Sequence, residues 1–353
     1  MSNPAGTIPP DAMAHLAFRE EWLDRHKEEA IEPALPIIDP HHHLWDHPGS
    51  RYLLDEILAD ANSGHRVLAT VFVECASMYR ADGPEAMKPV GETEFVNGIA
   101  AMSASGGFGD TRVAAGIVSF ADLALGGAVE EVLRAHIAAA PARFRGIRHA
   151  AGHDDSPEVQ NSHTKPPKDL YHSKKFREGF AKLKPLNLSF DAWQYHPQIP
   201  QLTELARAFP DTTIILDHFG GPLGIGPYQG KRAEIFAQWK KDTTELAKCH
   251  NVVVKLGGIN MAVSGFGWHR NAKPPTSEEL AKETRDYYLH TIEQFGPKRC
   301  MFESNFPVDR VSCSYLVLWN AFKRIASGFN AEEKDWLFRR CAAEAYRLPL
   351  GAG

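Results

Sequence analysis

The segment DPHHHLW at residues 39–45 contains two histidines, His41 and His43, with the spacing of a metal-binding pair. In an extended strand, residues two apart share a face, so these two imidazoles point the same way and can bind one ion. His42 then points to the opposite face. A histidine-rich loop with solvated rings would have the same local sequence, but this motif ends an apolar, β-branched segment, which favours a strand end.

A third histidine, His218, ends another apolar segment, IILDH, and the Gly-Gly-Pro sequence that follows soon after turns the chain away from the strand. A single histidine at a strand end is more often a packing residue. Together with His41 and His43, however, it makes three neutral nitrogen donors, which with one water complete an open zinc site. We therefore expect these three histidines to hold one divalent metal, for which zinc is best suited, although they could also act without a metal.

Charged residues also lie within or at the ends of apolar segments. Arg148 and His149 end the segment FRGIRH, where an arginine can hold a substrate carboxylate or a developing oxyanion. A surface ion pair is the alternative for Arg148. Glu74 and Lys255 lie in other apolar segments, where a charge is costly without a partner. For Lys255, a buried ion pair and a direct electrostatic role are both open.

A further carboxylate, Asp191, ends the segment LNLSFD, and an aromatic group formed by Trp193, Tyr195 and His196 follows it. Aromatic residues after a strand either line a substrate pocket or pack against neighbouring loops. We expect five residues to contact the substrate: Glu74, His149, Asp191, Trp193 and Lys255.

Eight apolar, β-branched segments recur along the chain, at residues 36–41, 66–75, 112–120, 143–149, 186–191, 212–218, 251–258 and 299–305. Most of the stretches between them have helical periodicity, as at 128–141, 176–185, 199–210 and 232–249. Strands that alternate with helices indicate a parallel sheet, and eight such units predict a (β/α)8 TIM barrel. A doubly wound sheet is the alternative, but the glycine-rich nucleotide motifs of that fold are absent.

The barrel is predicted to occupy residues 36–353 as a single domain, preceded by an extension over residues 1–35. Within the extension, residues 11–30 have the pattern of a helix with Asp11 as its N-cap. Long irregular stretches at 151–172, 220–231 and 260–279 follow the fourth, sixth and seventh predicted strands. Loops in these positions lie at the catalytic end of a barrel, so we expect them to define the substrate.

The chain has 353 residues and a formal net charge of −5 without a basic run, so nucleic acid is not an expected partner. Its five cysteines are scattered and form no CxxC motif, which favours a reducing cytoplasm. Neither a secretory leader nor an apolar run of the ~20 residues needed to cross a bilayer is recognisable. We expect a cytoplasmic protein that acts on a small molecule without a membrane partner. A homo-oligomer is compatible with the sequence.

The segments DPHHHLW, FRGIRH, LSFDAW, ILDHFGGP, VVVKLGG and MFESNFPVD resemble, in this order, the amidohydrolase-2 family of metal-dependent TIM-barrel hydrolases. The resemblance is greatest to its lactonase branch, whose members open pyrone-dicarboxylate, muconolactone and sugar-acid lactones. It implies hydrolysis of a small cyclic ester. It also implies that His41, His43 and His218 line the reacting centre and that Arg148 contacts a substrate carboxylate or ring oxygen.

One residue departs from this family pattern. The eighth strand of the family usually ends in a sequence like GSDWPV, whose Asp takes a proton from water or binds metal, whereas this chain has Asn305 at that position. An amide has no proton that titrates near neutral pH, so Asn305 can orient the attacking water but cannot deprotonate it. The base must then be Glu303, Asp191 or one of the histidines.

The sequence therefore predicts a hydrolase that opens a lactone or related cyclic ester, with His41, His43, Arg148, His218 and Asn305 at the reacting centre. Two other functions are open. A related branch of the same superfamily decarboxylates small aromatic acids without oxidation. A barrel that binds a ligand without turning it over is the third interpretation.

Overall fold

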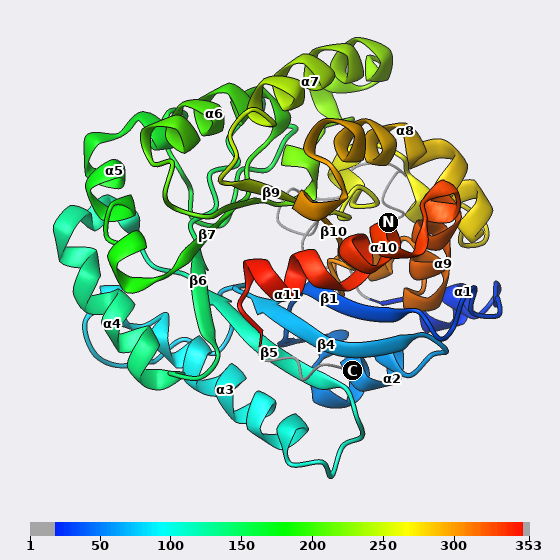
Figure 1. Cartoon of the computed structure of the whole chain (residues 1–353), viewed down its shortest axis with the longest axis horizontal. Helices are drawn as coiled ribbons and strands as arrows, with labels where there is room; N and C mark the ends of the chain where they lie inside the picture. The colour runs from blue at the N-terminus through cyan, green and yellow to red at the C-terminus, as the bar shows by residue number, and fades with distance from the viewer. Residues whose placement is uncertain (1–17, 349–353) are drawn as a thin grey trace, which may run out of the picture.

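The computed structural model describes residues 18–348, and its centre is an eight-stranded parallel sheet (Figure 1). The strands pair in the order β1-β4-β5-β6-β7-β8-β9-β10. Their bounds are Pro36–His42, Arg66–Val73, Arg112–Ser119, Phe144–Arg148, Ser189–Ala192, Ile214–Leu216, Val252–Leu256 and Cys300–Phe302. A small antiparallel pair, β2 (Trp45–His47) and β3 (Ser50–Tyr52), follows β1.

The two end strands of the sheet are joined between the end of β1 and the segment that follows β10. His42 forms a parallel bridge with Phe306, and the backbone N–H of His43 donates to the Phe306 carbonyl at 2.8 Å. The N–H of Asn305 donates to the carbonyl of His41 at 3.0 Å. These bonds close the sheet and confirm the predicted (β/α)8 barrel. They also set the histidine motif beside the segment that contains Asn305.

Helices surround the barrel and fill the stretches between strands (Figure 1). They are α1 (Glu20–Leu23), α2 (Leu54–Ala61), α3 (Val90–Ala104), α4 (Val129–Ala139), α5 (Lys174–Phe180), α6 (Ile199–Ala208), α7 (Arg232–Leu246), α8 (Ser277–Phe295), α9 (Tyr315–Ile325), α10 (Ala331–Asp335) and α11 (Cys341–Ala345). Local sequence explains some of their ends, as where Thr276 and Glu279 form a capping box at the start of α8. None of the helices in residues 18–348 is both long and apolar enough to cross a membrane.

The predicted helix over residues 11–30 is largely wrong in the part that the structure describes, while its N-cap Asp11 lies outside the described residues. Only Glu20–Leu23 is helical there, as α1. The carboxylate of Glu28 accepts hydrogen bonds from the backbone N–H of Ser277 at 2.7 Å and from Asn320 Nδ2 at 2.8 Å. These contacts with α8 and α9 anchor the segment in a non-helical conformation, which tertiary packing favours over local helix propensity.

The interior of the barrel is packed with apolar side chains that alternate along the strands, as Val71 and Val73 do in β4. The C-terminal segment also packs into this cluster through Cys341, Ala342 and Tyr346. Polar side chains therefore gather at the carboxyl ends of the strands, where the long loops begin.

Candidate active site

His41 and His43 lie side by side at the end of β1. Their Nε2 atoms are 3.3 Å apart, and His43 Nδ1 donates to the carbonyl of Val73 at 2.7 Å. His42 points away, since its Nε2 contacts Thr70 Oγ1 at 2.9 Å. Burial lowers the pKa of His42 to about 3 and that of His41 well below its usual value. These contacts agree with the alternation that the His-x-His spacing predicts.

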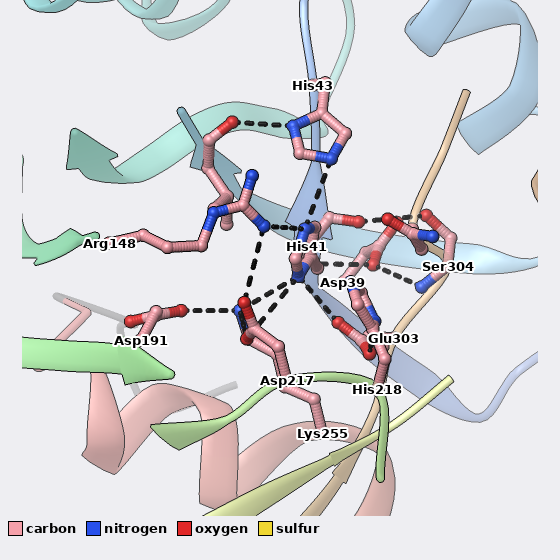
Figure 2. A network of polar contacts seen from close by, with 12 residues as sticks. Asp39, His41, His43, Arg148, Asp191, Asp217, His218, Lys255, Glu303 and Ser304 are labelled. Atoms are coloured by element: carbon pink, nitrogen blue, oxygen red, sulfur yellow. Dashed lines mark hydrogen bonds and ion pairs between the residues drawn. The ribbon is translucent and has the colours of Figure 1, made fainter. Parts of the chain in front are cut away.

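Glu303 connects two of the predicted site histidines (Figure 2). Its Oε2 lies 2.8 Å from His41 Nδ1, and its Oε1 lies 2.6 Å from His218 Nδ1. Two glycines after β9 make room for this arrangement. A Cβ at Gly257 would lie 2.5 Å from Glu303 Cγ, and one at Gly258 would lie 2.2 Å from His218 Nδ1. His218 therefore donates from Nδ1 to this carboxylate, which leaves its Nε2 as an acceptor, while His41 Nδ1 lies at ion-pair distance from the other carboxylate oxygen.

Arg148 is buried rather than on the surface, which excludes the surface ion pair. Its Nε donates to Glu74 Oε1 at 2.7 Å, and its Nη1 lies 3.4 Å from both Asp217 Oδ2 and His41 Nε2. Burial raises the pKa of the Glu74 carboxyl, but the charges of His163 and Arg148 outweigh it and hold that pKa below its usual range. Arg148 is thus a fixed cation beside the histidines (Figure 2).

Lys255 is a second buried cation, and it forms the buried ion pair that was one of its two interpretations. Its Nζ lies 2.6 Å from Asp191 Oδ2, 3.0 Å from Asp217 Oδ1 and 3.1 Å from His41 Nδ1. Asp191 also accepts a hydrogen bond from the hydroxyl of Tyr346 at 2.6 Å. Burial, only partly offset by Lys255, raises the pKa of Asp191 to about 6.

A cavity of about 270 Å³ opens above these side chains. Five of the predicted residues line it: His43, Arg148, Trp193, His218 and Asn305. The ring of Trp193 lies with its centroid 5.0 Å from that of His218, so the aromatic side chain forms part of the wall.

The other predicted residues lie behind the cavity wall. His41, Glu74, Asp191 and Lys255 have no exposed surface. His41 and Glu74 contact lining side chains from behind, whereas Lys255 and Asp191 lie deeper, with Lys255 against His41. His149 points elsewhere, since its Nδ1 accepts from the backbone N–H of Leu123 at 3.3 Å and its ring packs against Phe120 and Phe176. Contact with substrate through these five side chains would require the cavity wall to open.

Comparison with known proteins agrees with this geometry. The family model described as amidohydrolase matches residues 38–348. The chain belongs to the amidohydrolase family. Its relatives include an uncharacterized protein of Sinorhizobium fredii, y4mH, at 33% identity over 89% of this chain and 99% of that protein. An L-fucono-1,5-lactonase of Burkholderia multivorans is 25% identical over 88% of this chain and 96% of that enzyme.

Solved structures show the same fold. A Burkholderia multivorans amidohydrolase with bound zinc is 24% identical, with a TM-score of 0.67 over 89% of this chain and 99% of that one. A 5-carboxyvanillate decarboxylase of Sphingomonas paucimobilis is 12% identical, with a TM-score of 0.53 over 89% of this chain and 99% of that one. Both lactone and aromatic acid chemistry thus occur among proteins similar to this amidohydrolase.

Asn305 lines the cavity of this amidohydrolase next to the histidines. Its Nδ2 donates to Asp309 Oδ1 at 3.2 Å, and its amide oxygen has no hydrogen-bond partner among residues 18–348. Burial raises the pKa of Asp309 well above its usual value. The side chain of Asn305 is therefore oriented by a buried carboxyl and can present its amide oxygen to a water molecule.

The structure adds three residues that were not predicted as site members. Asp217 contacts both buried cations, Glu303 joins two histidines, and His163 lies on the cavity wall. Glu303 was named only as a candidate base. Asp217 could have been suspected because it directly precedes His218, whereas His163 lies in an irregular loop where no periodicity indicates its direction.

Among the described residues, His41, Asp217 and His218 form a group whose potential ligand atoms all lie within 4.8 Å of one another. Glu303 orients both imidazoles from Nδ1, as carboxylates commonly do for metal-bound histidines. Two imidazoles and a carboxylate are also a ligand set that suits zinc. The donor chemistry of this amidohydrolase therefore fits a divalent cation, with Asp217 as a ligand that the sequence did not indicate.

Proposed function

We propose that this amidohydrolase opens a small lactone or related cyclic ester by attack of water. The observation that carries this proposal is His218 on the cavity wall, held from behind by Glu303, with the cation Arg148 on the same wall. A base held by a carboxylate next to a positive charge is what acyl transfer to water requires. The L-fucono-1,5-lactonase relative supports the same reaction class.

In the proposed reaction, His218 accepts the proton of the attacking water at Nε2. Its Nδ1 stays protonated because it donates to Glu303 at 2.6 Å, and the negative carboxylate stabilises the imidazolium that forms. General base catalysis of this kind contributes about 10²–10⁴-fold to the rate. Asn305 orients the water through its amide oxygen.

The bond changes follow from this placement of the proton. The water oxygen bonds to the carbonyl carbon, and the carbonyl oxygen becomes an oxyanion that Arg148 stabilises on the cavity wall. The bond between the carbonyl carbon and the ring oxygen then breaks. The departing alkoxide takes the proton back from His218 Nε2, which yields a hydroxy acid and restores the neutral imidazole.

We also propose that zinc can bind to this site. His41, Asp217 and His218 would hold it, and a bound divalent cation would polarise the carbonyl group of an ester. This ligand set includes His218, which is also the proposed base. One nitrogen cannot hold a metal and accept a proton at the same time. We therefore expect the metal to compete with the proton for His218.

Zinc titration gives a direct prediction. Chelation should leave hydrolysis intact, whereas added zinc should inhibit it. At 100 times its Kd, zinc should also raise the free energy of unfolding by about 2.7 kcal/mol and, with it, the melting temperature. Magnesium, which prefers oxygen ligands, is the control and should do neither. Loss of activity on chelation with recovery on zinc addition would show that His218 is a ligand during turnover and not the base.

A panel of lactones and aromatic acids tests the reaction class. Ring opening releases acid without gas, which a pH-stat measures, whereas decarboxylation releases CO₂. The decarboxylase among the similar folds makes this the second candidate reaction. CO₂ release from aromatic acids, without acid release from any lactone, would overturn the proposal. A ligand that raises the melting temperature but is recovered unchanged would indicate a binding protein.

A further inference from the structure

His163 reaches the cavity from the long loop that follows β6. Its Nε2 lies 3.0 Å from Glu74 Oε2, and its side chain is 42% exposed on the cavity wall. The loop holds it on both sides. The N–H of Ser162 donates to the carbonyl of Gly152 at 2.8 Å, and Thr164 Oγ1 donates to that of Ala150 at 2.6 Å. His163 is therefore placed by the fold.

The cavity wall carries cations and no carboxylate. Arg148 and His163 line it, whereas no aspartate or glutamate among residues 18–348 does. Both cations contact the same buried group, since Arg148 Nε lies 2.7 Å from Glu74 Oε1. Arg148 also contacts the buried Asp217, so both cations are paired from behind the wall. Toward the cavity the two side chains present N–H donors and no carboxylate among the described residues of the wall competes for them, an arrangement that suits an anionic group.

One ring nitrogen of His163 is available to a ligand. Nε2 faces Glu74 Oε2 at 3.0 Å, and the negative charge of Glu74 raises the pKa of His163, which favours the imidazolium. The imidazolium also carries a proton on Nδ1, and this nitrogen has no partner among the described residues. A ligand in the cavity can accept that proton's hydrogen bond on the same side as Arg148.

We propose that His163 is a specificity residue and that the substrate of this amidohydrolase carries a carboxylate in addition to the ester group. The carboxylate is bound by Nδ1–H of His163, with Glu74 holding the opposite nitrogen. The identity of the ester depends on the proposed function above, but recognition of the carboxylate does not.

A matched pair of ligands and a matched pair of variants test this inference. The ligands are γ-butyrolactone bearing a carboxylate on the carbon next to the ring oxygen, and the corresponding carboxamide. The variants are His163→Gln and the control His172→Gln. His172 lies on the same loop and pairs with Glu204 at 3.0 Å, but it does not line the cavity.

Losing a hydrogen bond to a charged group should weaken binding about tenfold or more. We expect His163→Gln to raise the KM or Kd for the carboxylate by that factor and to change the value for the carboxamide less than about threefold. His172→Gln should change neither, and His163→Arg should retain the preference for the carboxylate. Melting curves of all variants check that they fold.

Calorimetric binding in a Glu303→Gln background separates this inference from the proposed reaction, because Glu303 does not line the cavity. If the wild type opens no lactone but binds the carboxylate more tightly than the carboxamide through His163, the reaction is wrong and the inference stands. Equal binding of the two ligands by the wild type overturns the inference. Equal losses of affinity for both ligands in His163→Gln also overturn the inference.

Discussion

Glu303→Gln should lower kcat about 10³-fold or more, the range seen when the carboxylate behind a catalytic histidine is replaced by its amide. The carboxylate accepts the N–H of His218 and lies 2.8 Å from Nδ1 of His41, whereas a glutamine side chain has one acceptor and one donor group. Where the amide NH2 group of the glutamine faces His218, that imidazole must change its tautomer and lose the free lone pair on Nε2. The imidazolium that forms during turnover also loses its counter-charge. Steady-state kinetics over a range of pH measures both effects.

Glu92→Gln is the matched control, since Glu92 is another fully buried glutamate close to the site. Its Oε1 accepts the backbone N–H groups of Cys75 at 3.1 Å and Ser77 at 2.7 Å, which an amide oxygen can also do. Burial, and next the charge of Glu74, raise the pKa of Glu92 to about 8, so near neutral pH its side chain is largely uncharged already. We expect kcat within about threefold of the wild type. An equal loss in both variants would mean that Glu303 acts only through packing.

Arg148→Met should lower kcat about 10²–10³-fold and also destabilise the fold by about 3–5 kcal/mol. The loss of kcat follows from removal of the positive charge that meets the oxyanion. The loss of stability follows because Glu74 and Asp217, both fully buried, would be left without this partner. Urea denaturation and steady-state kinetics measure the two losses separately.

The stability difference between Arg148→Met and the wild type should depend on pH. Glu74 has its pKa held below the usual 4.5 in the folded protein, because the charges of His163 and Arg148 outweigh the effect of burial. A carboxyl whose pKa is lowered in the folded protein stabilises the fold at pH values above its usual pKa. This contribution is lost as the pH falls through the lower pKa of the folded state. The variant lacks much of this contribution, so the difference should be largest near neutral pH and should narrow in acid.

Arg145→Met is the control for the same strand. Arg145 is half-buried and donates to the backbone carbonyls of Phe144 and Ala142 rather than to a carboxylate. We expect Arg145→Met to lower the free energy of unfolding by about 1 kcal/mol or less and to leave kcat unchanged. The double variant Glu74→Gln/Arg148→Met should recover stability but not activity. Unchanged stability in Arg148→Met would show that the buried carboxylates find another counter-charge.

Periodicity in the sequence determined the barrel and the direction of the first histidines. Each of the eight predicted strand segments overlaps one strand of the central sheet, because β-branched, continuously apolar segments suit a sheet that is buried on both faces. The alternation of a strand placed His41 and His43 on one face and His42 on the other. Both inferences use local rules that do not require knowledge of distant residues.

Only the tertiary structure decided which charged groups meet. Glu303 reaches both His41 and His218 because bonds between the end of β1 and the segment after β10 close the barrel. Asp217 and Lys255 pair across neighbouring strand ends, and His163 meets Glu74 through a loop without periodicity. The short helix α1 shows the same limit, since contacts of Glu28 with distant helices replaced local helix formation. Partners far apart in the chain are set by strand register and loop path, which residue types and spacing do not encode.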